Sequence, residues 1–141
     1  MQQAPIIHLA THGFFDSTNG NIPGEIALTN GFLTASEIFD MQLPADLVVL
    51  SACNTGRGDL TGDGVVGLSR SLVAAGVPSV VVSLWSVSDN ATKVLMEEFY
   101  RNLRVKKLAK AQALRQAMLT TMKDYPNPNF WAAFTLIGEG R

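Results

Sequence analysis

The single cysteine of the chain, Cys53, and one of its two histidines, His12, are residues that could together carry out nucleophilic chemistry. A thiol is a strong nucleophile only as the thiolate, and a nearby imidazole can accept its proton or form an ion pair with it. Cys53 directly follows an apolar run at residues 47–52, and His12 closely follows another at residues 6–10. The sequence therefore predicts a His/Cys dyad, provided that the two runs are neighbouring strands.

The elements that would position this dyad follow an α/β pattern. Four short runs are apolar almost without alternation, as expected for strands that are covered on both faces. They lie at residues 6–10, 47–52, 79–85 and 133–137. Helical patterns lie at residues 64–75, 90–103 and 107–123. The second run, the first helix and the third run form a predicted βαβ unit.

Parallel strands would bring the candidate residues to one edge of the sheet. Ligands of an open parallel sheet bind beyond the carboxyl ends of its strands, and adjacent strands lie only ~4.8 Å apart. Gly13 follows His12, and a small residue there leaves room for backbone N–H groups to approach a developing oxyanion. We expect the amides of Gly13 and Cys53 to be these donors. His8 lies inside the first run and is interpreted as a satisfied core or interface histidine.

Residues 22–39 are predicted to form a local excursion from the sheet. Asn30 and Gly31 have the composition of a two-residue hairpin turn. Thr34 and Glu37 then have the spacing of a capping box, which predicts that a helix begins there.

Composition favours one globular domain over residues 1–141, because 47% of the 141 residues are hydrophobic. A net charge of −1 disfavours nucleic acids and anionic membranes as partners. No apolar run reaches the ~18 residues of a membrane span, and the first residues lack the pattern of a signal peptide. With one cysteine and no internal disulfide, the chain is expected to be cytoplasmic.

Several motifs occur in an order that resembles CHAT domains, which are caspase-like domains of the clan that also holds caspases, separase, clostripain and gingipain. The motifs are ATHG at residues 10–13, LVVLSACNTG at 47–56, SLWSVSD at 83–89 and FWAAF at 130–134. The resemblance covers nearly the whole chain. The residues around the thiol differ from the Q-A-C-x-G form of true caspases, so their preference for aspartate is not expected.

The resemblance implies a caspase-like three-layer α/β sandwich with a mostly parallel sheet. It also implies a cysteine endopeptidase that cleaves peptide bonds in partner proteins, with His12 as base, Cys53 as nucleophile and no cofactor or metal. A complete domain of this type has about two further strands before the His-Gly strand. The first strand here would therefore have an open edge, at which an upstream segment or another chain could pair.

The loop after the third strand lines the substrate pocket in caspase-like peptidases. Asp89 could accordingly select a basic side chain, although its ordinary role before a helix is that of an N-cap, which Ser88 could share. Trp85 stands at the expected mouth of the cleft and is a second candidate for the pocket, with packing as its ordinary role.

Three other functions compete with the peptidase. The first is a catalytically silent module that keeps the fold as an interaction or regulatory surface. The second is a nucleotide-binding domain, because residues 62–67 match G-x-G-x-x-G, but about nine residues separate this motif from the end of the preceding strand. The third is a zinc site on His8, His12 and Cys53. It is disfavoured because four residues of a strand span ~13 Å.

Overall fold

A computed structural model describes residues 5–14, 22–51 and 62–141 of the chain. Its main sheet has four strands in the order β1-β5-β6-β7. The strands are β1 (Ile6–Leu9), β5 (Leu47–Leu50), β6 (Ser79–Ser83) and β7 (Phe134–Gly138). The first three are mutually parallel and β7 is antiparallel to β6, so the predicted mostly parallel sheet is confirmed.

The two central strands are buried on both faces, which explains their nearly continuous apolar sequences. Every residue of β5 and of β6 is buried. Successive side chains of a strand point to opposite faces, so alternate residues belong to different cores. Val48 and Val80 pack into one core, whereas Val49 and Val81 pack into the other.

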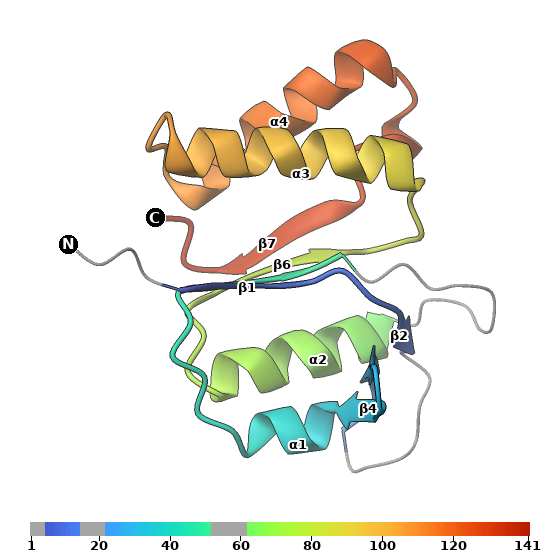
Figure 1. Ribbon diagram of the computed structural model, residues 1–141, viewed down its shortest axis with the longest axis vertical. Helices are drawn as coiled ribbons and strands as arrows, with labels where there is room; N and C mark the ends of the chain where they lie inside the picture. The colour runs from blue at the N-terminus through green and yellow to red at the C-terminus, as the bar shows by residue number, and fades with distance from the viewer. Residues whose placement is uncertain (1–4, 15–21, 52–61) are drawn as a thin grey trace.

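Helices cover both faces of the sheet and make three layers (Figure 1). One layer holds α1 (Ala35–Phe39) and α2 (Gly62–Ala74), and the other holds α3 (Asp89–Arg104) and α4 (Lys110–Asp124). A short 3-10 helix, η1 (Pro128–Phe130), leads into β7. The expected α/β sandwich is therefore the observed architecture.

The unit β5–α2–β6 is the predicted βαβ unit. After α2 the chain turns at Gly76, whose φ of 95° lies in the left-handed region that favours glycine. The turn is closed by two backbone hydrogen bonds, from Gly76 N–H to Val73 O at 3.1 Å and from Val77 N–H to Leu72 O at 3.1 Å. The predicted helix between these two strands is therefore confirmed, and it ends at the glycine that the sequence indicated.

A second sheet of three strands, β2 (Gly13–Phe14), β3 (Glu25–Leu28) and β4 (Gly31–Thr34), follows β1 in the chain. The predicted hairpin is present, but its turn was placed one residue too late. Leu28 pairs with Gly31, so Thr29 and Asn30 form the two-residue loop. Gly31 instead begins β4.

The predicted capping box at the start of α1 is confirmed. Glu37 N–H donates to Thr34 Oγ1 at 3.2 Å, and Thr34 N–H donates to the Glu37 carboxylate at 2.8 Å. The two hydrogen bonds satisfy the backbone amide groups that a helix start otherwise leaves without partners. They fix the point at which the hairpin ends and α1 begins.

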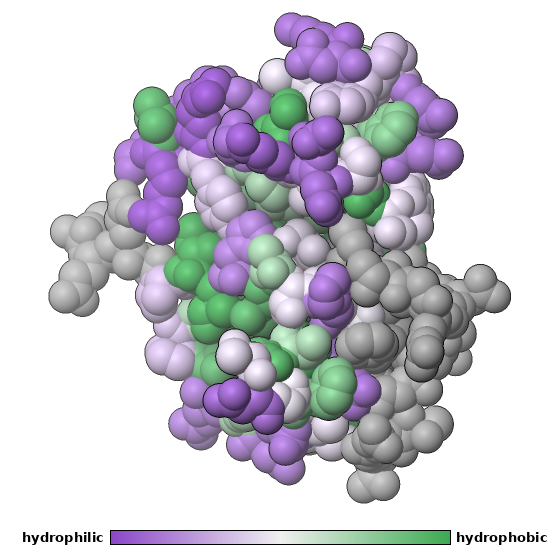
Figure 2. All heavy atoms as spheres, turned by 45° about the vertical axis from the view of Figure 1, so that its right-hand side comes forward, coloured by the Kyte–Doolittle hydropathy of each residue, from purple (hydrophilic) through white to green (hydrophobic). Residues whose placement is uncertain are grey.

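Within the described ranges, β1 is an outer strand of the four-stranded sheet. Its residues are partly or fully exposed, unlike those of β5 and β6. Figure 2 shows a patch of hydrophobic atoms left of centre, below the mostly hydrophilic outer surface of the α3 and α4 layer. None of the helices in the described part of the chain has the length and hydropathy needed to cross a bilayer.

Candidate active site

The pairing of β1 with β5 brings the carboxyl ends of these two strands to the same edge of the sheet. Leu9 is the register partner of Leu50. His12 is three residues beyond Leu9, and in the sequence Cys53 is three residues beyond Leu50. His12 is exposed at this edge, whereas Cys53, predicted as nucleophile and as an oxyanion donor, lies outside the described residues.

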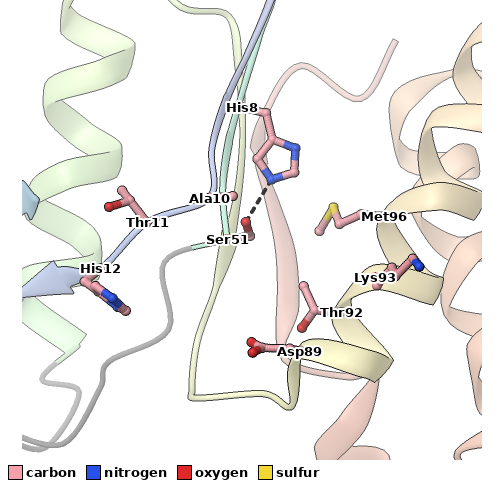
Figure 3. A pocket seen from close by; sticks show the side chains of 9 residues that line it. All are labelled: His8, Ala10, Thr11, His12, Ser51, Asp89, Thr92, Lys93 and Met96. Atoms are coloured by element: carbon pink, nitrogen blue, oxygen red, sulfur yellow. Dashed lines mark hydrogen bonds between the residues drawn. The ribbon is translucent and has the colours of Figure 1, made fainter. Parts of the chain in front are cut away.

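A cavity of about 490 Å³ opens beside the carboxyl ends of β1 and β5. Two histidines, a serine and several residues from the start of α3 line it (Figure 3). They are His8, Ala10, Thr11, His12, Ser51, Asp89, Thr92, Lys93 and Met96. The cavity is thus built from segments that are far apart in the sequence.

The small second sheet fixes the backbone around His12. Ala27 N–H donates to His12 O at 2.8 Å, and Thr11 Oγ1 donates to Ala27 O at 2.8 Å. Gly13, the predicted oxyanion donor, is buried in β2 and is paired with Ile26. The hairpin that the sequence presented as an excursion therefore holds the histidine segment from one side.

Asp89 lines the same cavity as His12. Of the two residues expected to cap the following helix, Ser88 is the N-cap and Asp89 is not, because the helix begins at Asp89. Ser88 Oγ accepts a hydrogen bond from Ala91 N–H at 3.3 Å. Since Ser88 caps the helix, the carboxylate of Asp89 lies in the first turn of α3, where a negative charge is favoured.

Trp85 lies in a different environment from the cavity-lining residues. Its ring packs against the core between the sheet and the α3–α4 layer, and its Nε1–H donates to Asn129 O at 3.0 Å. It is not among the residues that line the cavity. This environment matches the packing role that was the ordinary interpretation of the residue.

His8 has a more specific environment than the sequence suggested. Its Nε2 lies 2.8 Å from Ser51 Oγ, and its Nδ1 lies 2.7 Å from Tyr100 Oη. The histidine is satisfied, as predicted, but it is exposed on the cavity rather than buried in a core. Its partners are 43 and 92 residues away in the sequence, so no local pattern could have identified them.

Partial desolvation by the surrounding protein changes the acid–base behaviour of His8 and Tyr100. Desolvation lowers the pKa of His8 from its ordinary value of 6.5. Desolvation also raises the pKa of Tyr100 to about 12, against a smaller opposing effect of the Arg104 charge. At neutral pH the histidine is therefore mostly neutral, and the tyrosine keeps its proton.

The structure gives no support to the dinucleotide-binding interpretation. The glycines at positions 62, 64 and 67 lie inside α2 rather than in a loop before it. Gly67 packs against the backbone of Pro23, where an added Cβ would lie 2.3 Å from the carbonyl oxygen. Close packing of a helix explains this glycine without a ligand. Among the residues that the structure describes, no group of three His, Cys, Asp or Glu residues could hold a metal ion.

Comparison with known proteins agrees with the motifs and the fold. A family model described as CHAT domain matches residues 1–139. The tetratricopeptide repeat protein 28 of Homo sapiens is 41% identical over 109 residues, and that of Mus musculus is 40% identical over 109 residues. These residues are 76% of this chain but 4% of each relative, so the chain corresponds to a small part of their length. The chain belongs to the CHAT domain family, whose fold is caspase-like.

Proposed function

We propose that this chain is a cysteine-type endopeptidase domain in which His12 is the general base and Cys53 the nucleophile. The observation that carries the proposal is the β1–β5 register, which gives His12 and Cys53 the same number of residues beyond a paired position. Membership in a caspase-like family supports it, and so does the cavity that His12 lines.

The proposed reaction has two halves. His12 takes the thiol proton, and the Cys53 sulfur attacks a peptide carbonyl carbon. The resulting oxyanion accepts hydrogen bonds from the Gly13 and Cys53 amides, and the imidazolium returns the proton to the leaving amine. Water, deprotonated by His12, then attacks the thioester, so that a carboxylic acid leaves and the thiol is restored.

Asp89 is proposed to favour a basic side chain next to the cleaved bond. The carboxylate belongs to the lining of the cavity that contains His12, and an unlike charge there would be attracted. Lys93, one turn later on α3, also lines the cavity and acts against this preference. Trp85 is proposed only as a support behind the pocket, because its ring packs into the core.

The experiment that tests the dyad is covalent labelling with peptidyl acyloxymethyl ketones that carry basic, acidic or neutral residues beside the reactive group. Labelling is expected in the natural chain and should be lost in both Cys53→Ala and His12→Ala. Labelling that persists in His12→Ala would contradict the dyad. Asp89→Asn should reduce labelling by the basic probe alone, and Asp124→Asn, which neutralises an exposed carboxylate of α4 outside the cavity lining, is the matched control.

A second candidate function is a catalytically silent module that binds other chains. The observation that favours it is the outer position of β1 among the strands of the described residues, since an open strand edge can pair with an upstream segment or with another chain. The peptidase would bind a peptide or protein substrate, and the silent module would bind a partner protein. Complete absence of labelling by every peptidyl probe, in a chain that unfolds cooperatively, would favour this second function.

A further inference from the structure

Tyr100, His8 and Ser51 form a continuous hydrogen-bonded chain that ends at the candidate active site. Tyr100 comes from α3, His8 from β1, and Ser51 directly follows β5. The oxygen–nitrogen distances are 2.7 Å for Tyr100–His8 and 2.8 Å for His8–Ser51. Ser51 and His8 both line the cavity, and Figure 3 shows their contact on the side that faces α3.

The packing of the rings holds this chain of residues in place. The ring centroids of His8 and Tyr100 are 5.6 Å apart, and those of Tyr100 and Phe99 are 5.5 Å apart. Phe99 is completely buried in the core between the sheet and the α3–α4 layer. Tyr100 is therefore attached to a rigid part of the molecule, which is what a positioning residue requires.

Counting protons leaves two arrangements for a neutral His8. Either Tyr100 donates to Nδ1 and Nε2–H donates to Ser51, or Ser51 donates to Nε2 and Nδ1–H donates to Tyr100. A phenol is a more acidic donor than a neutral imidazole N–H, and an imidazole nitrogen is a more basic acceptor than a phenol oxygen. The first arrangement, with the hydrogen of His8 on Nε2, is therefore favoured.

This arrangement determines what Ser51 can do. His8 has no lone pair left for the serine proton, so it cannot act as a general base for Ser51. Because the serine oxygen accepts from His8, its own hydrogen is directed to another acceptor, and donation into Ser51 strengthens its donor character. Ser51 is thus prepared as a hydrogen-bond donor and not as a nucleophile.

We propose that the Tyr100–His8–Ser51 chain holds Ser51 as a hydrogen-bond donor to a backbone carbonyl oxygen of a peptide bound in the cavity. The inference rests on the proposed peptidase function and names a binding residue for it. A neutral carbonyl fits this environment better than an ion does. The cavity lining holds one carboxylate, Asp89, and one ammonium group, Lys93, whose opposite charges leave no excess to attract an anion, and a hydrogen-bond donor offers nothing to a cation.

The first test measures the tautomer of His8 by ¹⁵N NMR in the Cys53→Ala variant, with His12→Gln used to assign the two histidines. The hydrogen is expected on Nε2 at neutral pH. In Tyr100→Phe the donor to Nδ1 is lost, so the hydrogen should move to Nδ1 and Ser51 should donate to Nε2 instead. A hydrogen on Nδ1 in the parent protein would overturn the proposal. This readout does not depend on peptidase activity.

The second test uses the acyloxymethyl ketone that labels Cys53 best and separates its binding constant from its maximal rate of labelling. Ser51→Ala and Tyr100→Phe should each weaken binding by about 3- to 10-fold, the range of one neutral hydrogen bond, with little change in the maximal rate. Because both variants remove the same donor, the double variant should resemble either single one. Tyr125→Phe, which removes a hydroxyl group outside the cavity lining, is the control.

The outcomes of the second test are distinct. Unchanged binding in Ser51→Ala, or a loss confined to the maximal rate, would overturn the role of Ser51. A failure to label Cys53 in the natural chain would overturn the peptidase proposal and, with it, the carbonyl ligand. The tautomer measurement would still decide whether Ser51 is a donor, so the two failures can be told apart.

Discussion

At the residue scale, the imidazole of His8 lies between a serine and a tyrosine that come from other elements of the fold. A histidine in an unfolded chain has a pKa near 6.5, and desolvation in the folded protein lowers this pKa. The unfolded state therefore binds a proton more readily than the native state as the pH falls. His8 links the free energy of unfolding to pH through this difference.

We predict that His8 lowers the free energy of unfolding as the pH drops below 6.5. Well above that value neither state is protonated and the effect is absent. Once the pH is below the pKa of the native state, the effect becomes constant. Urea unfolding of the natural chain and of His8→Gln between pH 7.5 and 5 should show a weaker pH dependence in the variant. Equal slopes for both proteins would contradict the prediction.

At the element scale, α2 approaches the segment before β3 more closely than a side chain would permit. An added methyl group on Gly67 would lie 2.3 Å from the carbonyl oxygen of Pro23 and 3.3 Å from a methyl carbon of Ile22. The Pro23 oxygen belongs to the backbone, which cannot move aside as a flexible side chain does. Gly67 is therefore required by the packing of the helix and not by a phosphate group.

We predict that Gly67→Ala lowers the free energy of unfolding by about 1–3 kcal/mol, the usual effect of an overpacked contact. In an exposed helix the same change would be stabilising, because alanine has the higher helix propensity. Val66→Ala, at an exposed neighbouring position, should change stability by less than about 0.5 kcal/mol. Chemical denaturation measures both values, and a stabilised Gly67→Ala variant would exclude the close contact.

At the scale of the whole molecule, the two cores are connected through β5 and β6. Leu72 belongs to the core on the α1–α2 side, and Phe99 belongs to the core on the α3–α4 side. Both cores include alternate residues of the same two strands. Loss of either helical layer would expose one face of these strands, so we expect the layers to unfold together.

We predict that Leu72→Ala and Phe99→Ala shift one common unfolding transition, with losses of about 2–5 and 3–5 kcal/mol respectively. Trp85 and Trp131 both pack in the core that contains Phe99, so tryptophan fluorescence reports on that layer. Circular dichroism reports on all helices. If Leu72→Ala shifted the circular dichroism transition but not the fluorescence transition, the layers would be independent.

The open edge of the sheet gives a prediction for amide hydrogen exchange. Amides of the central strand β6 should exchange slowest, and those of the outer strand β1 should exchange faster because one edge of β1 faces no further strand in the described residues. If a second copy pairs with β1, its protection should increase with protein concentration. Protection of β1 equal to that of β6 in dilute solution would contradict an open edge.

The sequence by itself determined the layered α/β architecture and the identity of the candidate dyad. Continuous apolar runs can be recognised because β5 and β6 are buried on both faces, and Gly76 marks a helix end because its backbone conformation favours glycine. The Thr34–Glu37 capping box was predictable because its two residues lie only three positions apart in the sequence. The hairpin turn was misplaced by one residue because Gly31, whose φ of 153° favours glycine, is the first residue of β4 and not part of the loop.

Only the tertiary structure decided which residues share the cavity. The register of β1 with β5 aligns Leu9 with Leu50, and the packing of α3 over the sheet brings Tyr100 to His8. The structure also showed that Ser88, and not Asp89, is the N-cap of α3. Contacts of this kind depend on how separate elements pack. The residues that make them lie too far apart in the sequence for a local pattern to specify the contacts.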